Sequence, residues 1–117
     1  MKKSMLILVI IGIMLLAGSL SAKSSQLLQV FEISPNPMGS YTVVSLEFQQ
    51  DVNVCVYIEE QGGAIVKTLF NGVVGKGINL TWDRITDSGY YATNGLYSVV
   101  VAYEGRYTST KKTLILK

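Results

Sequence analysis

The sequence predicts an all-β protein, a seven-stranded immunoglobulin-like antiparallel β-sandwich. Three observations favour this class. Apolar and polar residues alternate in several short segments, which is the period of a half-buried strand. Turn signals separate these segments at intervals of about 8 to 12 residues. No segment beyond residue 22 has a convincing helical period, and 117 residues correspond to one domain.

The first 22 residues differ from the rest of the chain. Lys2 and Lys3 precede an unbroken apolar run over residues 5–18, and small or polar residues predominate at 19–22. This order is typical of a secretory signal peptide, and the run is shorter than the ~20 apolar residues of a membrane span. We therefore predict a signal peptide over residues 1–22, cleaved between residues 19 and 23, with a retained helical anchor as the alternative. The protein is then exported to the periplasm, the cell surface or the medium of a bacterium.

A short lead-in over residues 23–29 precedes the predicted domain, residues 30–117. Pro35 and Pro37 each lack a backbone donor, so we expect this segment at a sheet edge or in an entry loop. The sequence Gln61-Gly62-Gly63 can supply the positive φ angles of a tight hairpin. The predicted strands are, in order, residues 30–34, 41–48, 52–58, 64–70, 78–82, 96–103 and 107–116.

The strand that ends at Trp82 and the strand over residues 96–103 define the predicted core. Ile78, Leu80 and Trp82 share one strand face, so the indole is expected to enter the core. Both faces of the later strand are apolar enough for a central position in a sheet. The predicted core consists of Val44, Leu46, Phe48, Val54, Val56, Ile58, Ile78, Leu80, Trp82, Tyr97, Val99, Val101, Leu114 and Leu116.

Composition excludes several classes of function. Removal of Lys2 and Lys3 leaves eight basic and eight acidic residues, so the exported part lacks the electrostatic footprint of a protein that binds nucleic acid or an anionic membrane. The chain has no histidine, the commonest general base and metal ligand. Cys55 is the single cysteine, so it can pair only with a second chain, and no imidazole can activate it. We expect no enzymatic activity and no cofactor.

Two acidic residues in the loop after Trp82 are weak candidates for a metal site. Asp83 and Asp87 could offer carboxylate oxygens to calcium, but two carboxylates make a weak site and their spacing does not match the twelve-residue calcium loop. We expect instead that Asp83 accepts hydrogen bonds from the backbone amides that follow, and that Asp87 begins a turn with Ser88 and Gly89.

Tyr90 and Tyr91 lie next to each other in the same loop. Paired tyrosines on a loop can bind a glycan or a protein partner, because each ring combines an apolar body with a polar tip. The alternative is that both rings pack over the end of the sandwich.

Several short motifs occur in one order over residues 31–117. They are Ser34-Pro35-Asn36-Pro37, Val56-Tyr57-Ile58, residues 63–69, Gly77 with Trp82-Asp83, Gly89, Asn94-Gly95-Leu96-Tyr97 and the terminal residues 111–117. This ordered set resembles the Ig-like domain of the flagellar hook-capping protein and its relative, the C-terminal sorting domain of type IX secretion cargo. Members of this family usually have glycine after the Trp-Asp pair and an acid shortly after it, where this sequence has Arg84 and Thr86. We expect the loop to keep its length and to lose a tight turn or a polar contact.

These observations predict a small exported, non-catalytic module that acts through protein contacts in an extracellular or cell-envelope assembly. The last strand is the expected open edge, where another chain could add a strand, and Lys111, Lys112 and Lys117 would limit unwanted pairing. The resemblance implies one alternative, a sorting domain that engages the outer-membrane export machinery. A sorting domain usually follows a large cargo, however, and only the short lead-in precedes residue 31. A second alternative is a glycan-binding module that uses Tyr90 and Tyr91.

Overall fold

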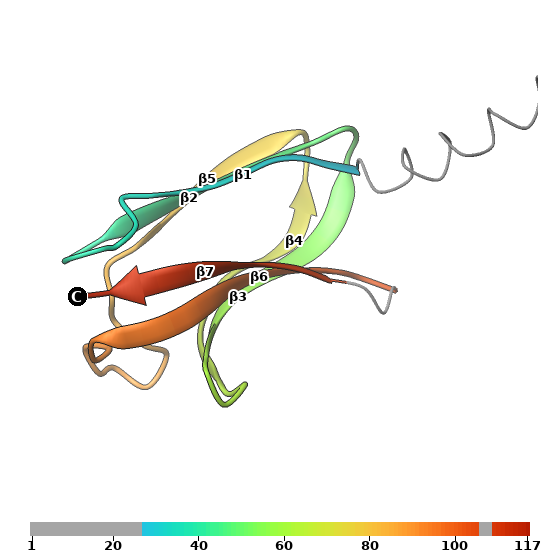
Figure 1. Ribbon diagram of the computed structural model, residues 1–117. Coiled ribbons are helices and arrows are strands. Elements are labelled where there is room, and N and C mark those ends of the chain that lie inside the picture. Colours follow the sequence, from blue (N-terminus) through green and yellow to red (C-terminus); the bar gives the residue numbers. More distant parts are fainter. Residues whose placement is uncertain (1–26, 106–108) are drawn as a thin grey trace, which may run out of the picture.

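The structure is a computed structural model that describes residues 27–105 and 109–117 (Figure 1). The described residues contain no α-helix, and none of their segments is a helix long and apolar enough to cross a membrane. The predicted signal peptide, residues 1–22, lies outside the described residues. The strands are β1 (Leu28–Ser34), β2 (Thr42–Phe48), β3 (Val52–Glu60), β4 (Ile65–Val74), β5 (Gly77–Trp82), β6 (Gly95–Tyr103) and β7 (Ser109–Leu116).

The strands form two antiparallel sheets, which are the two layers seen in Figure 1. One sheet has the order β1-β2-β5 and the other the order β4-β3-β6-β7. Three connections, from β2 to β3, from β4 to β5 and from β5 to β6, pass from one sheet to the other. The predicted all-β class, with seven antiparallel strands in two sheets, is confirmed.

Side-chain alternation explains why the central strands form where they do. In β2, Val44, Leu46 and Phe48 are buried, whereas Val43, Ser45 and Glu47 are partly or fully exposed. β3 has the same pattern, with Val54, Val56 and Ile58 buried. Because successive side chains of a strand point to opposite faces, each strand places one apolar row between the two sheets.

The core between the sheets surrounds Trp82, which is 1% exposed. The indole and the Tyr97 ring meet edge to face with centroids 6.4 Å apart, a favourable aromatic geometry. The residues expected in the core are all buried except two. Ile78 and Leu80 are only partly buried, because β5 is the end strand of its sheet and no strand covers its outer side.

Simple alternation fails to predict two of the buried residues. Met38 is fully buried although it follows the two prolines, because it forms a bridge to Leu116 of β7. Val100 is fully buried on the outer face of the four-stranded sheet, where it lies between Tyr57 of β3 and Lys111 of β7.

β4 extends beyond its expected end at residue 70 and runs to Val74. Asn71 and Gly72, which locally indicate a turn, lie opposite Cys55 and Val54 of β3. A partner strand that ended at residue 70 would leave the first half of β3 without a hydrogen-bonding neighbour on that side, so the ladder overrides the local turn signal. Two register shifts between β3 and β4 mark β-bulges, which increase the local twist.

Candidate functional site

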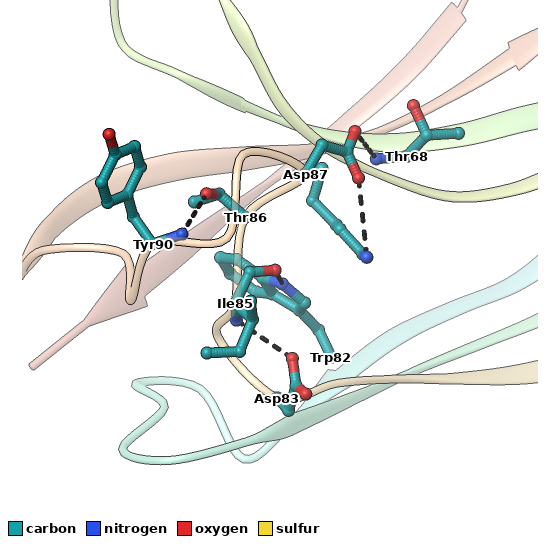
Figure 2. A network of polar contacts seen from close by, with 8 residues as sticks. Thr68, Trp82, Asp83, Ile85, Thr86, Asp87 and Tyr90 are labelled. Atoms are coloured by element: carbon teal, nitrogen blue, oxygen red, sulfur yellow. Dashed lines mark hydrogen bonds and ion pairs between the residues drawn. The ribbon is translucent and has the colours of Figure 1, made fainter.

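The loop between β5 and β6 folds back onto the buried tryptophan (Figure 2). The indole Nε1–H of Trp82 donates to the carbonyl oxygen of Ile85 at 2.8 Å. The carboxylate of Asp83 accepts the backbone N–H of Ile85 at 3.0 Å, which is the local bond that an aspartate forms in a turn. Both bonds anchor Ile85, so the start of the loop is fixed to the core.

The same loop then forms a small hairpin. Thr86 N–H donates to the carbonyl oxygen of Tyr90 at 2.8 Å, and Ile85 is paired with Tyr91. Gly89 has a φ of 93° and closes the turn through a 2.9 Å bond from its N–H to the carbonyl of Thr86. Tyr90 and Tyr91 are both exposed, at 72% and 56%, and neighbouring side chains of an extended arm tend to point to opposite sides.

Asp87 connects this hairpin to the border of β4. Its N–H donates to the carbonyl of Val66 at 2.9 Å, and its carboxylate accepts the N–H of Thr68 at 3.1 Å. The same carboxylate lies 3.5 Å from the ammonium group of Lys67. Asp87 therefore occupies the free edge of β4 at residues 66–68.

The two carboxylates proposed as weak calcium ligands are held apart. In Figure 2, Asp87 lies at the β4 border and Asp83 lies on the far side of Ile85 and Trp82. Each carboxylate has its own protein donors. Within residues 27–105 and 109–117, no group of three or more histidine, cysteine, aspartate or glutamate residues could hold a metal ion.

Arg84 joins three segments at this end of the sandwich. Its side chain is almost fully buried, with the residue 4% exposed. Its Nε donates to the carbonyl oxygen of Ala92 at 2.8 Å, and its Nη1 donates to the main-chain oxygens of Gly39 at 2.9 Å and Lys117 at 3.2 Å. Its Nη2 donates to the side-chain oxygen of Asn94. The hairpin, the loop after β1 and the end of β7 therefore all depend on one guanidinium group.

The charge of Arg84 is balanced by dipoles and an aromatic ring. No side-chain carboxylate of the described residues forms an ion pair with it, but the guanidinium lies 4.8 Å from the centroid of the Tyr91 ring, within the range of a cation–π interaction. Four oxygen acceptors and this ring replace the water that a buried cation loses.

Arg84 also corrects the expectation that the loop loses a tight turn or a polar contact. Its backbone has a φ of 75°, in the left-handed region that glycine adopts most easily. The turn is therefore kept without glycine, and the side chain adds four hydrogen bonds. The sequence signal that could have indicated this role is the arginine at a position where the hook-capping domains that the sequence resembles usually have glycine.

The outer edge of β7, expected to be open, is occupied over its second half. Met38 N–H donates to the carbonyl of Ile115 at 2.7 Å, and Lys117 N–H donates to the carbonyl of Met38 at 3.1 Å. The amide group of Asn36 donates to the carbonyl of Thr113 and accepts the N–H of Ile115, at 2.9 and 3.0 Å. Residues 36–38 therefore pair with β7 as a short parallel segment.

The three lysines predicted to guard the last strand have separate positions. Lys112 donates to the carbonyl of Phe31 at 2.7 Å and lies over its ring, so it protects the edge of β1. Lys117 is exposed, and its main-chain groups bind Arg84 and Met38. Lys111 forms a 2.7 Å ion pair with Glu59 across β6, above the buried Val100.

The Lys111 ion pair has a defined pH dependence. The hydrogen bond to Glu59 and the charge of that carboxylate raise the pKa of Lys111 above its ordinary value of 10.5. Because the folded protein holds this proton more tightly than the unfolded chain, the pair supports folding at neutral pH. That support is lost as the pH rises through the raised pKa.

Cys55 lies on the outer face of the four-stranded sheet and is partly exposed. Its neighbours across the ladder are Asn71 of β4 and Ala102 of β6. An open depression beside it is also lined by Tyr103 and Glu104. None of these side chains is a histidine, lysine or arginine, the residues that commonly activate a thiol.

Comparisons with known proteins identify the fold. No protein-family model matches the sequence, and no curated protein matches it. The crystal structure of dimeric latent PorU from Porphyromonas gingivalis is similar with a TM-score of 0.60 and 25% identity, over 74% of this chain and 9% of PorU. PorZ, described as an essential bacterial surface component of the type IX secretion system of the same organism, is similar with a TM-score of 0.52 and 17% identity, over 74% of this chain and 11% of PorZ.

The similarity concerns a small part of each neighbour. This chain matches 9% of PorU and 11% of PorZ, so each of those proteins is much longer than the shared domain. The shared feature is therefore an all-β domain, one example of which belongs to a type IX secretion component. The resemblance to the hook-capping domain has no matching family model and stays a prediction.

Proposed function

We propose that this chain is a small exported, non-catalytic immunoglobulin-like module that binds other proteins at the bacterial cell surface, in connection with type IX secretion. The observation that carries this proposal is the similarity of most of the chain to a small part of PorZ, a surface component of that system. A domain that recurs as about a tenth of larger proteins is an independently folding unit.

The immunoglobulin-like assignment is supported by the strand order. Seven short antiparallel strands are divided into β1-β2-β5 and β4-β3-β6-β7, and three connections cross between the sheets. Domains of this kind commonly use loops and strand edges for recognition while the core stays structural.

The non-catalytic role rests on the chemistry of the available side chains. The chain has no histidine, and both loop aspartates are engaged in turn or edge contacts. An active site needs a nucleophile, a base and a stabilising donor in one place. The contacts around Arg84 serve instead to hold chain segments together.

The similarity to PorZ also favours a second candidate function, a sorting domain that engages the outer-membrane export machinery. The two functions predict different fates for the C-terminus, because type IX secretion usually removes or modifies the end of its sorting domains. Glycan binding by Tyr90 and Tyr91 as a pair gains no support from the contacts of these residues, since the Tyr91 ring lies against the Arg84 guanidinium.

Cell fractionation with intact-mass measurement of the exported protein tests these functions. For the binding module we expect a cell-surface protein that starts between residues 20 and 23 and keeps Lys117. A mass that lacks the C-terminal residues, or carries an addition there, supports the sorting domain instead. Recovery of the protein in the cytoplasm with residues 1–22 retained would contradict both functions.

A further inference from the structure

The borders of the two sheets are protected to different degrees. Lys112 covers a carbonyl of β1, residues 36–38 pair with β7, and Asp87 occupies part of the edge of β4 beside two bulges. Such charges, bulges and covering segments prevent a strand edge from pairing with other chains.

Among residues 27–105 and 109–117, none of these protective features is found at β5. It contains no charged residue and no proline from Gly77 to Trp82, and its register with β2 has no bulge. Phe48 N–H donates to the carbonyl of Lys76, so the hydrogen-bonded pairs continue at Ile78 and Leu80. In the intervening pairs the backbone groups of Asn79 and Thr81 point away from β2, towards the free edge. The described part of the chain contains no bond to these outward groups.

The apolar core reaches the surface beside this edge. Ile78 and Leu80 are partly buried and lie on the inner face of β5, opposite Leu46 and Val44 of β2. Phe70 of β4 is also partly buried and faces the core opposite Val56. β4 and β5 belong to different sheets and do not pair, so a row of apolar side chains is incompletely covered between them.

We propose that the free edge of β5 accepts an extended segment of another polypeptide as a fourth strand of the three-stranded sheet. This inference rests on the proposed binding function and names the surface that performs it. The inner residues of the added strand lie beside Ile78 and Leu80, so every second residue of the partner is apolar. Its main-chain groups bond to Asn79 and Thr81. The segment is uncharged where it faces the uncharged edge of β5.

A second folded copy of this chain fits the edge less well. Six residues of strand are about 20 Å long, and sheet layers lie ~10 Å apart, so edge-to-edge contact of two such strands covers roughly 200 Å² on each copy. A stable interface covers about 800 Å² per partner. An extended segment needs no second folded surface, and its inner side chains lie on the same side of the sheet as the partly buried Ile78 and Leu80.

A peptide with the sequence of residues 42–48, with Glu47→Gln to remove its charge and with acetylated and amidated ends, is a suitable probe. This sequence already pairs with β5 along the opposite edge and carries Val44, Leu46 and Phe48 in one row. Titration into the exported protein, followed by amide hydrogen exchange measured by NMR, should show saturable protection of the Asn79 and Thr81 amides. We expect their exchange to slow at least about tenfold, equivalent to ~1.4 kcal/mol.

Two substitutions at one position separate main-chain pairing from other binding. Asn79→Pro removes the outward N–H without removing a bond to β2, as proline at a free edge allows, and should abolish the protection of Thr81. Asn79→Ala keeps the N–H and should therefore retain the protection of Thr81. If the proline variant does not fold by circular dichroism, Ile78→Lys replaces it, because a charge on the inner face of β5 should also prevent binding.

Three results at β5 would overturn the assignment. The first is that the Asn79 and Thr81 amides gain no protection at about 1 mM peptide, a weak affinity. The second is that both disruptive variants bind the peptide as the wild type does. The third is protection that rises with protein concentration in the absence of peptide, which indicates a second copy. Protection along β7 instead of β5 also overturns it but leaves a binding function intact. A cytoplasmic location contradicts the proposed function independently of the peptide result.

Discussion

Arg84→Ala should destabilise the domain by about 1 to 3 kcal/mol, the range expected when buried acceptors lose their donor. The substitution deletes four hydrogen bonds from a buried guanidinium and leaves the carbonyls of Ala92 and Gly39 without their donor. Since small domains are stable by only about 5 to 15 kcal/mol, a large share of the total is lost. Urea unfolding followed by circular dichroism measures the effect.

Arg84→Gly is the matched control for the backbone. It removes the same side chain, but glycine adopts the left-handed φ of 75° without the cost that alanine has there. The glycine variant should therefore be more stable than the alanine variant by about 1 kcal/mol. Equal stabilities of the two variants would show that the backbone is unstrained, and a loss below about 1 kcal/mol in both would contradict the role of the side chain.

Trp82→Ala should cost about 3 to 5 kcal/mol, the usual range for deletion of a large buried ring. The indole is 1% exposed, packs on Tyr97 and holds the carbonyl of Ile85. The alanine variant therefore loses both core volume and the anchor of the loop. Thermal unfolding monitored by circular dichroism provides the comparison.

Trp82→Phe separates the two contributions of the indole. Phenylalanine keeps an aromatic ring in the core but has no N–H, so the carbonyl of Ile85 loses its donor at a cost of about 1 to 3 kcal/mol. We expect this variant to fold and to exchange the amides of residues 85–92 faster than the wild type. A phenylalanine variant as unstable as the alanine variant would show that the hydrogen bond outweighs the packing.

The sequence predicts the central strands well, because one local pattern determines them. The buried rows of β2, β3 and β6 follow directly from alternation along the chain. β4 is predicted too short, since Asn71 and Gly72 locally favour a turn and only the ladder of β3 extends the strand through them. Tertiary pairing decides that case.

The polar contacts at the loop end could not be predicted in the same way. Arg84 binds main-chain oxygens of Gly39 and Lys117, which lie 45 and 33 residues away in the sequence. Asp87 binds Thr68 across 19 residues. No local period encodes such distances, so the residues signal only a polar loop until the fold brings their partners together. For the same reason, the sequence does not predict that Asn36 and Met38 cover the edge of β7.

Amide hydrogen exchange of the exported protein without any partner tests the central claim most directly, that β5 is the unprotected border of this sandwich. We expect an alternating pattern of exchange along β5, with slow exchange at Ile78 and Leu80 and fast exchange at Asn79 and Thr81. We also expect slow exchange at Ile115, whose N–H is held by Asn36. Uniformly slow exchange along β5, or fast exchange at Ile115, would contradict this claim.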